Sequence, residues 1–209
     1  EDLLAAADAA GWPALERFCT AGSGLPGIEV EPDALASASG LASGTRTLAV
    51  YAERWAQAPA GPLCVYLHGV RDPGNVGAVL RSAQAFGASC VALGAGSADP
   101  FGPKAVRASM GAVFAVPLAR APSLSALPGR KVAMVAGTGV PLSELSPSEP
   151  TPRAQMVTVL IGAERDGLPA EIVAQADCQA HIPIQIHSLN AAMAATVALY
   201  ELTRRIAPA

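Results

Sequence analysis

Three polar turns carry the residues of this chain that are best suited to chemistry. The first covers residues 72–81, the second residues 162–167 and the third residues 188–190. Each has the pattern of a short apolar strand, a tight polar turn and a helix. Because ligands of parallel α/β sheets bind beyond the carboxyl ends of the strands, the three turns predict one shared site.

The first turn places an arginine and an amide on the same helix. The apolar residues of this helix share one face, and Arg81 lies about 150° from the centre of that face at roughly 100° per residue. An outward guanidinium can clamp a phosphate or orient a reacting hydroxyl, because its fork of donors matches two oxygens. Asn75 would then fix the geometry beside it. The alternative is that Asp72 or Asn75 only caps the helix and Arg81 is a solvated surface residue.

The second turn has a glycine at each end, which allows the backbone to approach a ligand closely. Position 164 is a glutamate and the GxGxxG pattern is absent, so a site for a dinucleotide pyrophosphate is disfavoured. Glu164 can instead pair with Arg81 or Arg165. A tight turn with surface side chains is the alternative, and it suits Arg165 and Asp166 better than Glu164.

The third turn opens a helix predicted over residues 188–206. Ser188 is a natural N-cap, and both capping and a role at the site are expected of it. Asn190 is a poor helix former whose amide requires partners. A helix that is apolar nearly all round is buried, and part of this one is expected to pack against a second subunit. Its apolar stripe consists of Leu189, Ala192, Met193, Thr196, Val197 and Tyr200.

The elements that must hold these turns follow an α/β pattern. Continuous apolar strands that alternate with helices predict a mostly parallel sheet covered on both faces. Residues 1–54 are expected to form a small α/β appendage, with a helical pattern over residues 2–20 that is broken by Gly11 and Pro13, and residues 55–62 a linker. The predicted strands of the main domain are 63–67, 90–93, 113–117, 132–136, 157–161 and 180–182. Its other helices are predicted at 74–86 and 168–176, and a short helix or turn at 104–110. Strands are also predicted at 28–30 and 47–51, and a loop at 143–152.

Composition excludes several classes of protein. With 209 residues, 51% hydrophobic and 15% charged, the chain is of an ordinary globular type with one or two domains. Its net charge of −3 argues against a general electrostatic nucleic-acid binder, although it leaves room for a local arginine patch. The sequence has no run of about 18 apolar residues, so no membrane span is expected. No signal-peptide pattern is found at its start.

Cysteine and histidine spacing does not favour a metal site or a hydrolase. The cysteines at positions 19, 64, 90 and 178 are widely spaced, which indicates reduced core residues of a cytosolic protein rather than a zinc site or a disulfide framework. No histidine pair has zinc-ligand spacing together with cysteine. Ser188 follows His187 directly, and without a GxSxG elbow this pair does not form a hydrolase triad.

With these residues in view, the chain resembles the SpoU (TrmH) family of RNA ribose 2′-O-methyltransferases, within the SPOUT superfamily. The resemblance covers roughly residues 63–206. It rests on the segments HGVRDPGNVGAVLRSAQAFGA (68–88), KAVRASMGAVF (104–114), VLIGAERDGLPAEI (159–172) and IPIQIHSLNAAMAATVALYEL (182–202). Residues 1–54 resemble, more weakly, the end of an L30e-like RNA-binding domain that often precedes this fold.

The resemblance implies an α/β sheet with a C-terminal trefoil knot, a homodimer and bound S-adenosyl-L-methionine. It implies that Arg81 activates or orients a ribose 2′-hydroxyl in a site completed by the other subunit, and RNA follows from the need for that hydroxyl. The other predicted catalytic residues are Asn75, Glu164, Ser188 and Asn190. The implied cofactor contacts, largely through the backbone, are Gly137, Thr138, Ile161, Gly162, Ile182 and Leu189.

Several alternatives stay open at the level of the sequence. The weak L30e-like segment favours ribosomal RNA over transfer RNA, and a resistance enzyme that protects a producer's ribosome is a sub-case. A non-catalytic RNA-binding factor of the same fold predicts a broken motif, whereas the five candidate catalytic residues are all present. A small-molecule Rossmann protein predicts GxGxxG after the first strand. The stretch 182–188 is shorter than the family pattern and lacks its usual glycine.

Overall fold

The computed structural model describes residues 2–40, 44–145 and 156–206, and the chain divides into two compact units, Glu1–Arg54 and Trp55–Ala209. The predicted loop at 143–152 therefore lies mostly outside the described residues. Unit 1 has the order α1 (Asp2–Ala9), β1 (Glu16–Thr20), β2 (Ile28–Val30), α2 (Pro32–Ser39) and β3 (Thr47–Val50). Its sheet has the order β2-β1-β3, with β2 parallel and β3 antiparallel to β1.

The helical pattern predicted over residues 2–20 breaks at Gly11 as expected, but the helix predicted after the break is wrong. Gly11 takes a left-handed conformation with φ 68° and ends the helix, and residues 16–20 form β1 instead. Phe18 of β1 is paired with Ile28 on one side and Leu48 on the other, so long-range pairing overrides the local helical pattern.

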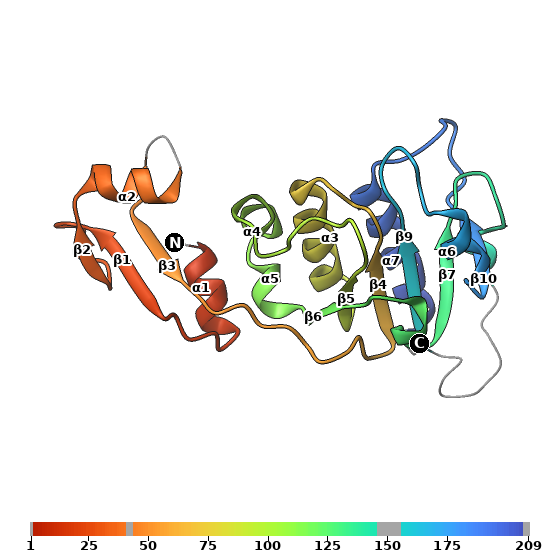
Figure 1. Ribbon diagram of the computed structural model, residues 1–209, viewed down its shortest axis with the longest axis horizontal. Coiled ribbons are helices and arrows are strands. Elements are labelled where there is room, and N and C mark those ends of the chain that lie inside the picture. Colours follow the sequence, from red (N-terminus) through yellow and green to blue (C-terminus); the bar gives the residue numbers. More distant parts are fainter. Residues whose placement is uncertain (1, 41–43, 146–155, 207–209) are drawn as a thin grey trace. The chain divides into compact units, whose positions relative to one another are not determined.

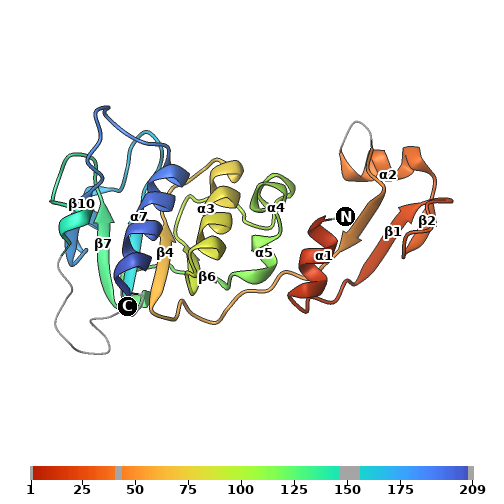
Figure 2. The same ribbon diagram turned by 180° about the vertical axis from the view of Figure 1, so that it is seen from behind.

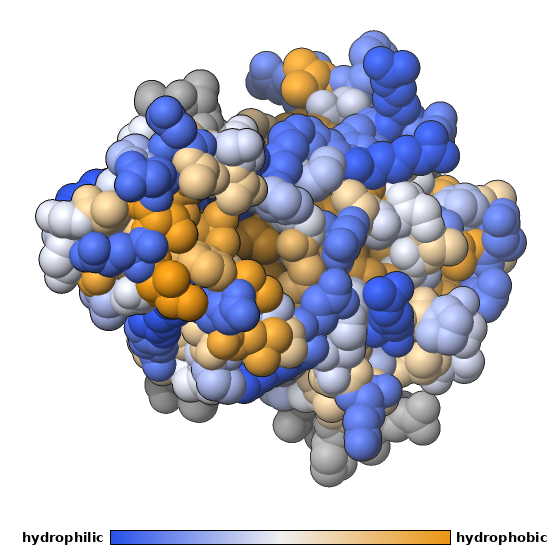
Figure 3. Space-filling view, turned by 60° about the vertical axis from the view of Figure 1, so that its left-hand side comes forward, coloured by the Kyte–Doolittle hydropathy of each residue, from blue (hydrophilic) through white to orange (hydrophobic). Residues whose placement is uncertain are grey.

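Unit 1 leaves Ile28 58% and Val50 42% exposed. Hydrophobic residues also gather in a patch on the face of the molecule drawn in Figure 3.

Unit 2 is built on a seven-stranded sheet with the order β6-β5-β4-β9-β7-β10-β8, and its recorded strand pairs are all parallel. This confirms the predicted α/β class and the mostly parallel sheet. The strands are β4 (Leu63–Leu67), β5 (Cys90–Leu93), β6 (Leu118–Arg120), β7 (Arg130–Met134), β8 (Val140–Pro141), β9 (Val157–Ile161) and β10 (Cys178–His181). The helices are α3 (Pro73–Ala85), α4 (Pro103–Ser109), α5 (Ala112–Ala115), α6 (Ala170–Ala174) and α7 (Ala191–Ile206), with short 3₁₀ turns η1 (Leu124–Ala126) and η2 (Leu142–Glu144).

Helices cover both faces of this sheet. On one face, Leu63, Val65 and Leu67 of β4 pack in a core with residues of α3, α5 and α7. On the other face, Tyr66 of β4 packs in a second core with residues of η1 and α6. Alternate side chains of one strand thus enter opposite cores, which is why the strand reads as an unbroken apolar run. In both ribbon views α3 lies between α4 and α7 (Figures 1 and 2).

Two predicted boundaries in unit 2 are wrong. The strand predicted over 113–117 is the short helix α5, and the strand β6 begins only at Leu118. Gly111, with φ 95°, turns the chain into α5 so that Val113 and Ala112 are buried in the core beside α3. The last helix begins at Ala191 instead of Ser188, because the cap lies two residues further along, as described below.

The segment predicted as a linker, residues 55–62, packs on unit 2. Ala56 forms an isolated parallel bridge with Ala119 on the edge strand β6. The Trp55 ring meets the Phe101 ring edge-on at 5.1 Å, and the Arg120 guanidinium lies 4.2 Å above the Trp55 ring. The segment therefore covers the edge of the sheet, which would otherwise expose unpaired backbone groups.

All four cysteines are free, and those at 19, 64 and 90 are buried, as the spacing predicted. Cys64 and Cys90 face each other on neighbouring strands, and the hydrogen bond between the two thiols together with burial raises the pKa of Cys64. No helix within the described ranges combines the length and apolar character needed to cross a membrane.

Candidate active site

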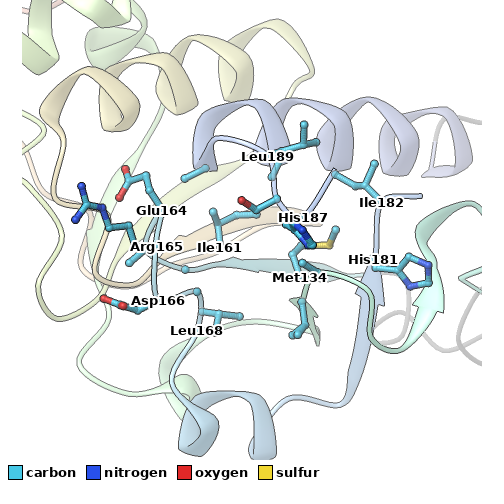
Figure 4. A pocket seen from close by; sticks show the side chains of 18 of the residues that line it. Met134, Ile161, Glu164, Arg165, Asp166, Leu168, His181, Ile182, His187 and Leu189 are labelled. Atoms are coloured by element: carbon cyan, nitrogen blue, oxygen red, sulfur yellow. The ribbon is translucent and has the colours of Figure 1, made fainter. Parts of the chain in front are cut away.

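A cavity of about 440 Å³ opens at the carboxyl ends of β7, β9 and β10. This is the edge of the sheet where parallel α/β proteins bind ligands. Figure 4 shows Glu164, Arg165 and Asp166 on one side of the cavity and His181 on the opposite side, with Ile161 and His187 between them. Its apolar wall includes Met134, Ile161, Leu168, Ile182, Ile184 and Leu189.

The turn after β9 is closed on itself and has no room for a side chain at its start. Ala163 and Gly167 exchange two backbone hydrogen bonds of 3.1 and 3.0 Å, and Gly167 has φ 66°. A Cβ atom on Gly162 would lie 2.1 Å from the Gly167 carbonyl carbon and 2.3 Å from the Leu168 nitrogen. The glycines of this turn therefore serve its closure, and the closed turn holds Glu164 at the cavity.

A Gly162→Ala substitution is expected to lower the free energy of unfolding by about 1–3 kcal/mol, because the added methyl group overlaps backbone atoms that cannot move independently. Gly102→Ala is the matched control: like Gly162, Gly102 does not have a positive φ, and the nearest atom to its added Cβ is the Asp99 carbonyl oxygen at 3.3 Å, so no severe overlap is expected. Urea unfolding of both variants measures the difference. Equal stability of the two variants would contradict the steric argument.

Three polar side chains from the three turns form a hydrogen-bonded chain. Asn75 Nδ2 donates to Glu164 Oε1 at 2.6 Å, and Asn190 Nδ2 donates to Asn75 Oδ1 at 3.0 Å. These residues are 89 and 115 positions apart in the sequence. The Asn75 amide is thus used at both ends, which fixes its orientation and joins α3, the β9 turn and the start of α7.

Asn190, not Ser188, caps the last helix. Its Oδ1 accepts hydrogen bonds from the backbone N–H groups of Ala192 at 2.9 Å and Met193 at 3.3 Å, and its backbone carbonyl accepts from Ala194. An asparagine at this position satisfies the otherwise unpaired amides of the first turn. The prediction of Ser188 as the cap is therefore wrong. Ser188 is exposed and lines the cavity.

The first turn is capped by Asp72, as one of the alternatives predicted. Asp72 Oδ1 accepts from the Gly74 backbone N–H at 2.8 Å and pairs with Lys104 Nζ at 2.7 Å. The hydrogen bond from Lys104, together with that from Gly74, holds the pKa of the Asp72 carboxyl below its ordinary value. This cap leaves Asn75 free to bond with Glu164 rather than with its own helix.

Arg81 does not enter the cavity of its own chain. It is exposed on α3 and is absent from the cavity lining. It follows Asn75 by six residues, which places it about 9 Å further along the helix and about 120° away in direction. Glu164 pairs with Asn75, so the predicted pairing of Glu164 with Arg81 or Arg165 is wrong.

Four of the six predicted cofactor residues line the cavity: Ile161, Gly162, Ile182 and Leu189. The strand β7 contributes Met134, Val135 and Ala136 to the wall, and Gly137 and Thr138 follow directly outside the lining. Sequence reasoning missed the β7 residues and both cavity histidines, although the place of the β7 residues and His181 at the carboxyl ends of β7 and β10 was a usable signal. His181 Nδ1 is buried without a hydrogen-bond partner in the described part of the chain. Within that part, no group of three or more metal-binding side chains exists.

Comparison with known proteins agrees with this geometry. A family model described as the SpoU rRNA methylase family matches residues 62–200. A Mycobacterium bovis protein named as an uncharacterized tRNA/rRNA methyltransferase is 35% identical over 88% of this chain and 68% of its own length. A Bacillus subtilis 23S rRNA guanosine 2′-O-methyltransferase is 33% identical over 64% of this chain, which spans 54% of that protein.

Among solved structures, an AdoMet-bound rRNA methyltransferase from Sinorhizobium meliloti superposes with a TM-score of 0.85 and 29% identity. The match covers 100% of this chain and 86% of that one, so it includes both units. The fold and the family match thus point the same way as the four motif segments. Because the family model covers well over half of the sequence, this chain belongs to the SpoU rRNA methylase family.

Proposed function

We propose that this protein transfers a methyl group from S-adenosyl-L-methionine to a ribose 2′-hydroxyl of ribosomal RNA, with 23S rRNA as the substrate. The observation that carries the proposal is the chain Asn190–Asn75–Glu164 beside the cavity at the sheet's carboxyl edge. The Bacillus subtilis relative is named for this reaction on 23S rRNA, and the Sinorhizobium meliloti neighbour binds AdoMet.

The cavity has the size and chemistry that the cofactor requires. Its volume of about 440 Å³ falls in the range of small-ligand sites. The apolar side chains of Met134, Leu168 and Leu189 suit the flat faces of an adenine, and the strand-end backbone can bond its edge. Glu164 supplies a carboxylate at the cavity, which favours a cationic ligand over a phosphate.

The residues around the cavity would act by positioning. The cofactor brings a methyl group that is already activated on a sulfonium, so the protein must align it with the hydroxyl and help that hydroxyl lose its proton. Arg81 is a poor base because its guanidinium stays protonated in proteins. We assign it the roles of orienting the hydroxyl and stabilising the developing alkoxide. Asn75, Glu164, Ser188 and Asn190 would hold the reacting groups in register.

We propose a homodimer in which Arg81 serves the cavity of the partner subunit. Two observations support this. Arg81 points away from its own cavity, and α7 leaves an apolar ridge in water with Met193 62%, Val197 38% and Tyr200 49% exposed. The opposite face of α7 is buried through its small residues Ala191, Ala195 and Ala198. A second copy that covers the ridge would remove apolar surface from water and bring another Arg81 to the site.

Three further assignments rest on the same family relationship. Unit 1 would bind RNA as the remaining part of an L30e-like domain, in keeping with its separate small sheet. The C-terminal segment would form a trefoil knot, in keeping with its path from β10 back to α7, which packs on α3 and β9. A ribosomal RNA substrate would place the protein in the cytoplasm.

A direct assay tests the proposal. The purified chain is incubated with tritiated AdoMet and unmodified 23S rRNA made by transcription, and with transfer RNA in a parallel reaction. Incorporation into 23S rRNA that blocks reverse transcription at one nucleotide, at low deoxynucleotide concentration, is the expected result. Methylation of transfer RNA alone would favour that alternative substrate. AdoMet and RNA binding without transfer would favour a non-catalytic RNA-binding factor.

A further inference from the structure

A basic segment lies within this acidic chain. Between residues 73 and 120 the sequence has a single carboxylate, Asp99, whereas the chain as a whole has a net charge of −3. The same segment has four cations, Arg81, Lys104, Arg107 and Arg120. Such a local excess of positive charge attracts a polyanion even when the net charge of the protein does not.

Two of these four cations are already engaged. Lys104 pairs with Asp72 at 2.7 Å, and Arg120 lies over the Trp55 ring at 4.2 Å. Arg81 and Arg107 are exposed, and the described residues offer neither of them a hydrogen bond or an ion pair. An exposed guanidinium with no carboxylate beside it keeps its fork of donors available for a phosphate.

Close packing of α4 on α3 brings these two arginines to one surface. A Cβ atom on Gly77 would lie 2.4 Å from the Ala105 carbonyl oxygen and 2.6 Å from Ala108 Cβ, so α4 lies directly against α3 at this point. Arg81 follows Gly77 by four residues, which places it about 6 Å further along α3 and about 40° further round on the same side. Arg107, in the last turn of α4, lies on the side of that helix away from Ala105 and Ser109, so both arginines are exposed on the solvent side of this helix pair.

Met110, at the end of α4, is held in an unusual conformation. Its φ is 50°, and no other residue besides glycine among those described has a positive φ. Such a conformation costs on the order of 1 kcal/mol for a residue with a side chain. Its side chain is 57% exposed, so burial in the protein core does not offset the cost. The conformation itself ends α4 as a left-handed C-cap, with the Met110 N–H donating to the Arg107 carbonyl oxygen. Glycine is the usual residue at such a cap, so an exposed methionine there is the feature that suggests a role in binding.

We propose that Arg81, Arg107 and Met110 form one RNA-contacting surface, here called the α3–α4 surface, that takes a single-stranded part of the substrate. This inference rests on the proposed function. Arg107 holds a backbone phosphate near the target nucleotide, and Met110 lies against the face of a neighbouring base. An exposed thioether meets a base face only where the base is unstacked, which selects a loop or bulge over a continuous duplex.

The test compares variants in filter binding of unmodified 23S rRNA at several KCl concentrations. Arg107→Gln is expected to weaken binding roughly tenfold and to lower the salt slope by about 0.7–0.9, the value of one lost phosphate contact. Arg107→Lys should retain most of the salt slope and lose part of the affinity, because the charge stays and the fork is lost. Lys131→Gln is the control: it removes a positive charge that lies at the amino end of β7 and is already paired with Asp177 at 4.0 Å, so it should leave both quantities unchanged.

Met110→Gly separates RNA contact from structure. This variant relieves the positive φ, so its melting temperature should be equal or higher while its affinity for the RNA falls. A competing RNA duplex should displace the wild-type protein poorly compared with a competing hairpin loop. The affinity for AdoMet should stay within about twofold in all variants, because none of the changed residues lines the cavity.

The outcomes distinguish this inference from the proposed function. If the wild-type chain methylates 23S rRNA while Arg107→Gln and Met110→Gly bind it as tightly as the wild type, the α3–α4 surface is not an RNA contact and the proposed function stands. Equal competition by duplex and loop would overturn the single-stranded preference. If the wild-type chain neither binds nor methylates RNA, both proposals fall.

Discussion

An Arg81→Ala variant is expected to lose methyl transfer by at least about a hundredfold while its AdoMet affinity stays within roughly threefold. Arg81 is exposed and lies outside its own cavity, so its removal should neither unfold the chain nor disturb cofactor contacts. Single-turnover methylation of 23S rRNA measures the first quantity and calorimetry the second. Wild-type turnover in this variant would contradict the assignment of Arg81 to the methyl-transfer step.

Mixing of subunits then tests whether Arg81 acts across the proposed dimer. Arg81→Ala retains its cavity, and Leu189→Trp, which fills the cavity, retains its arginine. Each homodimer should be inactive. Dimers reassembled from equal amounts of both should recover roughly a quarter of wild-type activity, since half are mixed and each mixed dimer has one complete site. No recovery in mixed dimers that form normally would show that Arg81 acts within its own subunit.

A Val197→Glu variant is expected to be a folded monomer without methyltransferase activity. Val197 lies at the centre of the exposed α7 ridge, so a glutamate is compatible with the isolated fold but costly in an apolar interface. Analytical ultracentrifugation at micromolar concentration measures the assembly state, and circular dichroism confirms that the fold is retained.

Ala170→Glu is the matched control, because it adds the same charge at an exposed position on α6, outside the ridge. This variant should remain dimeric and active. A dimeric and active Val197→Glu protein would mean that the second copy docks elsewhere, and the cross-subunit role of Arg81 would lose its structural support.

The sequence predicted the main sheet well because its strands are buried on both faces. The five residues of β4 are all buried and form one continuous apolar run, whereas a helix exposed on one side would interrupt such a run with polar residues. The segment 113–117 has the same apolar character, yet it begins as helix α5, because Gly111 turns the chain and α3 lies beside it. Local composition does not contain that tertiary contact.

The site was predicted in its parts but not in its connections. The three turns do meet, and Asn75, Glu164 and Asn190 do form one network. The pairing of Glu164 with an arginine was wrong because Glu164 accepts from Asn75, which lies 89 positions away. The capping by Ser188 was wrong because Asn190 supplies the cap, and its amide nitrogen also reaches Asn75, 115 positions away. Charge and cap preferences favour the nearest suitable partner, whereas the fold supplied a distant amide.

Because the Asn190 side chain both caps α7 and bonds to Asn75, two backbone amides of α7 report whether the Asn75–Glu164 network is formed. The backbone N–H groups of Ala192 and Met193 are protected from hydrogen exchange while they donate to the side-chain oxygen of Asn190. The side-chain nitrogen of Asn190 donates to Asn75 at the same time. Fraying of the first turn of α7 and disorder of the active site are therefore a single equilibrium. Hydrogen-exchange rates at these two positions would measure, without substrate, the fraction of time in which the Asn190–Asn75 contact is formed.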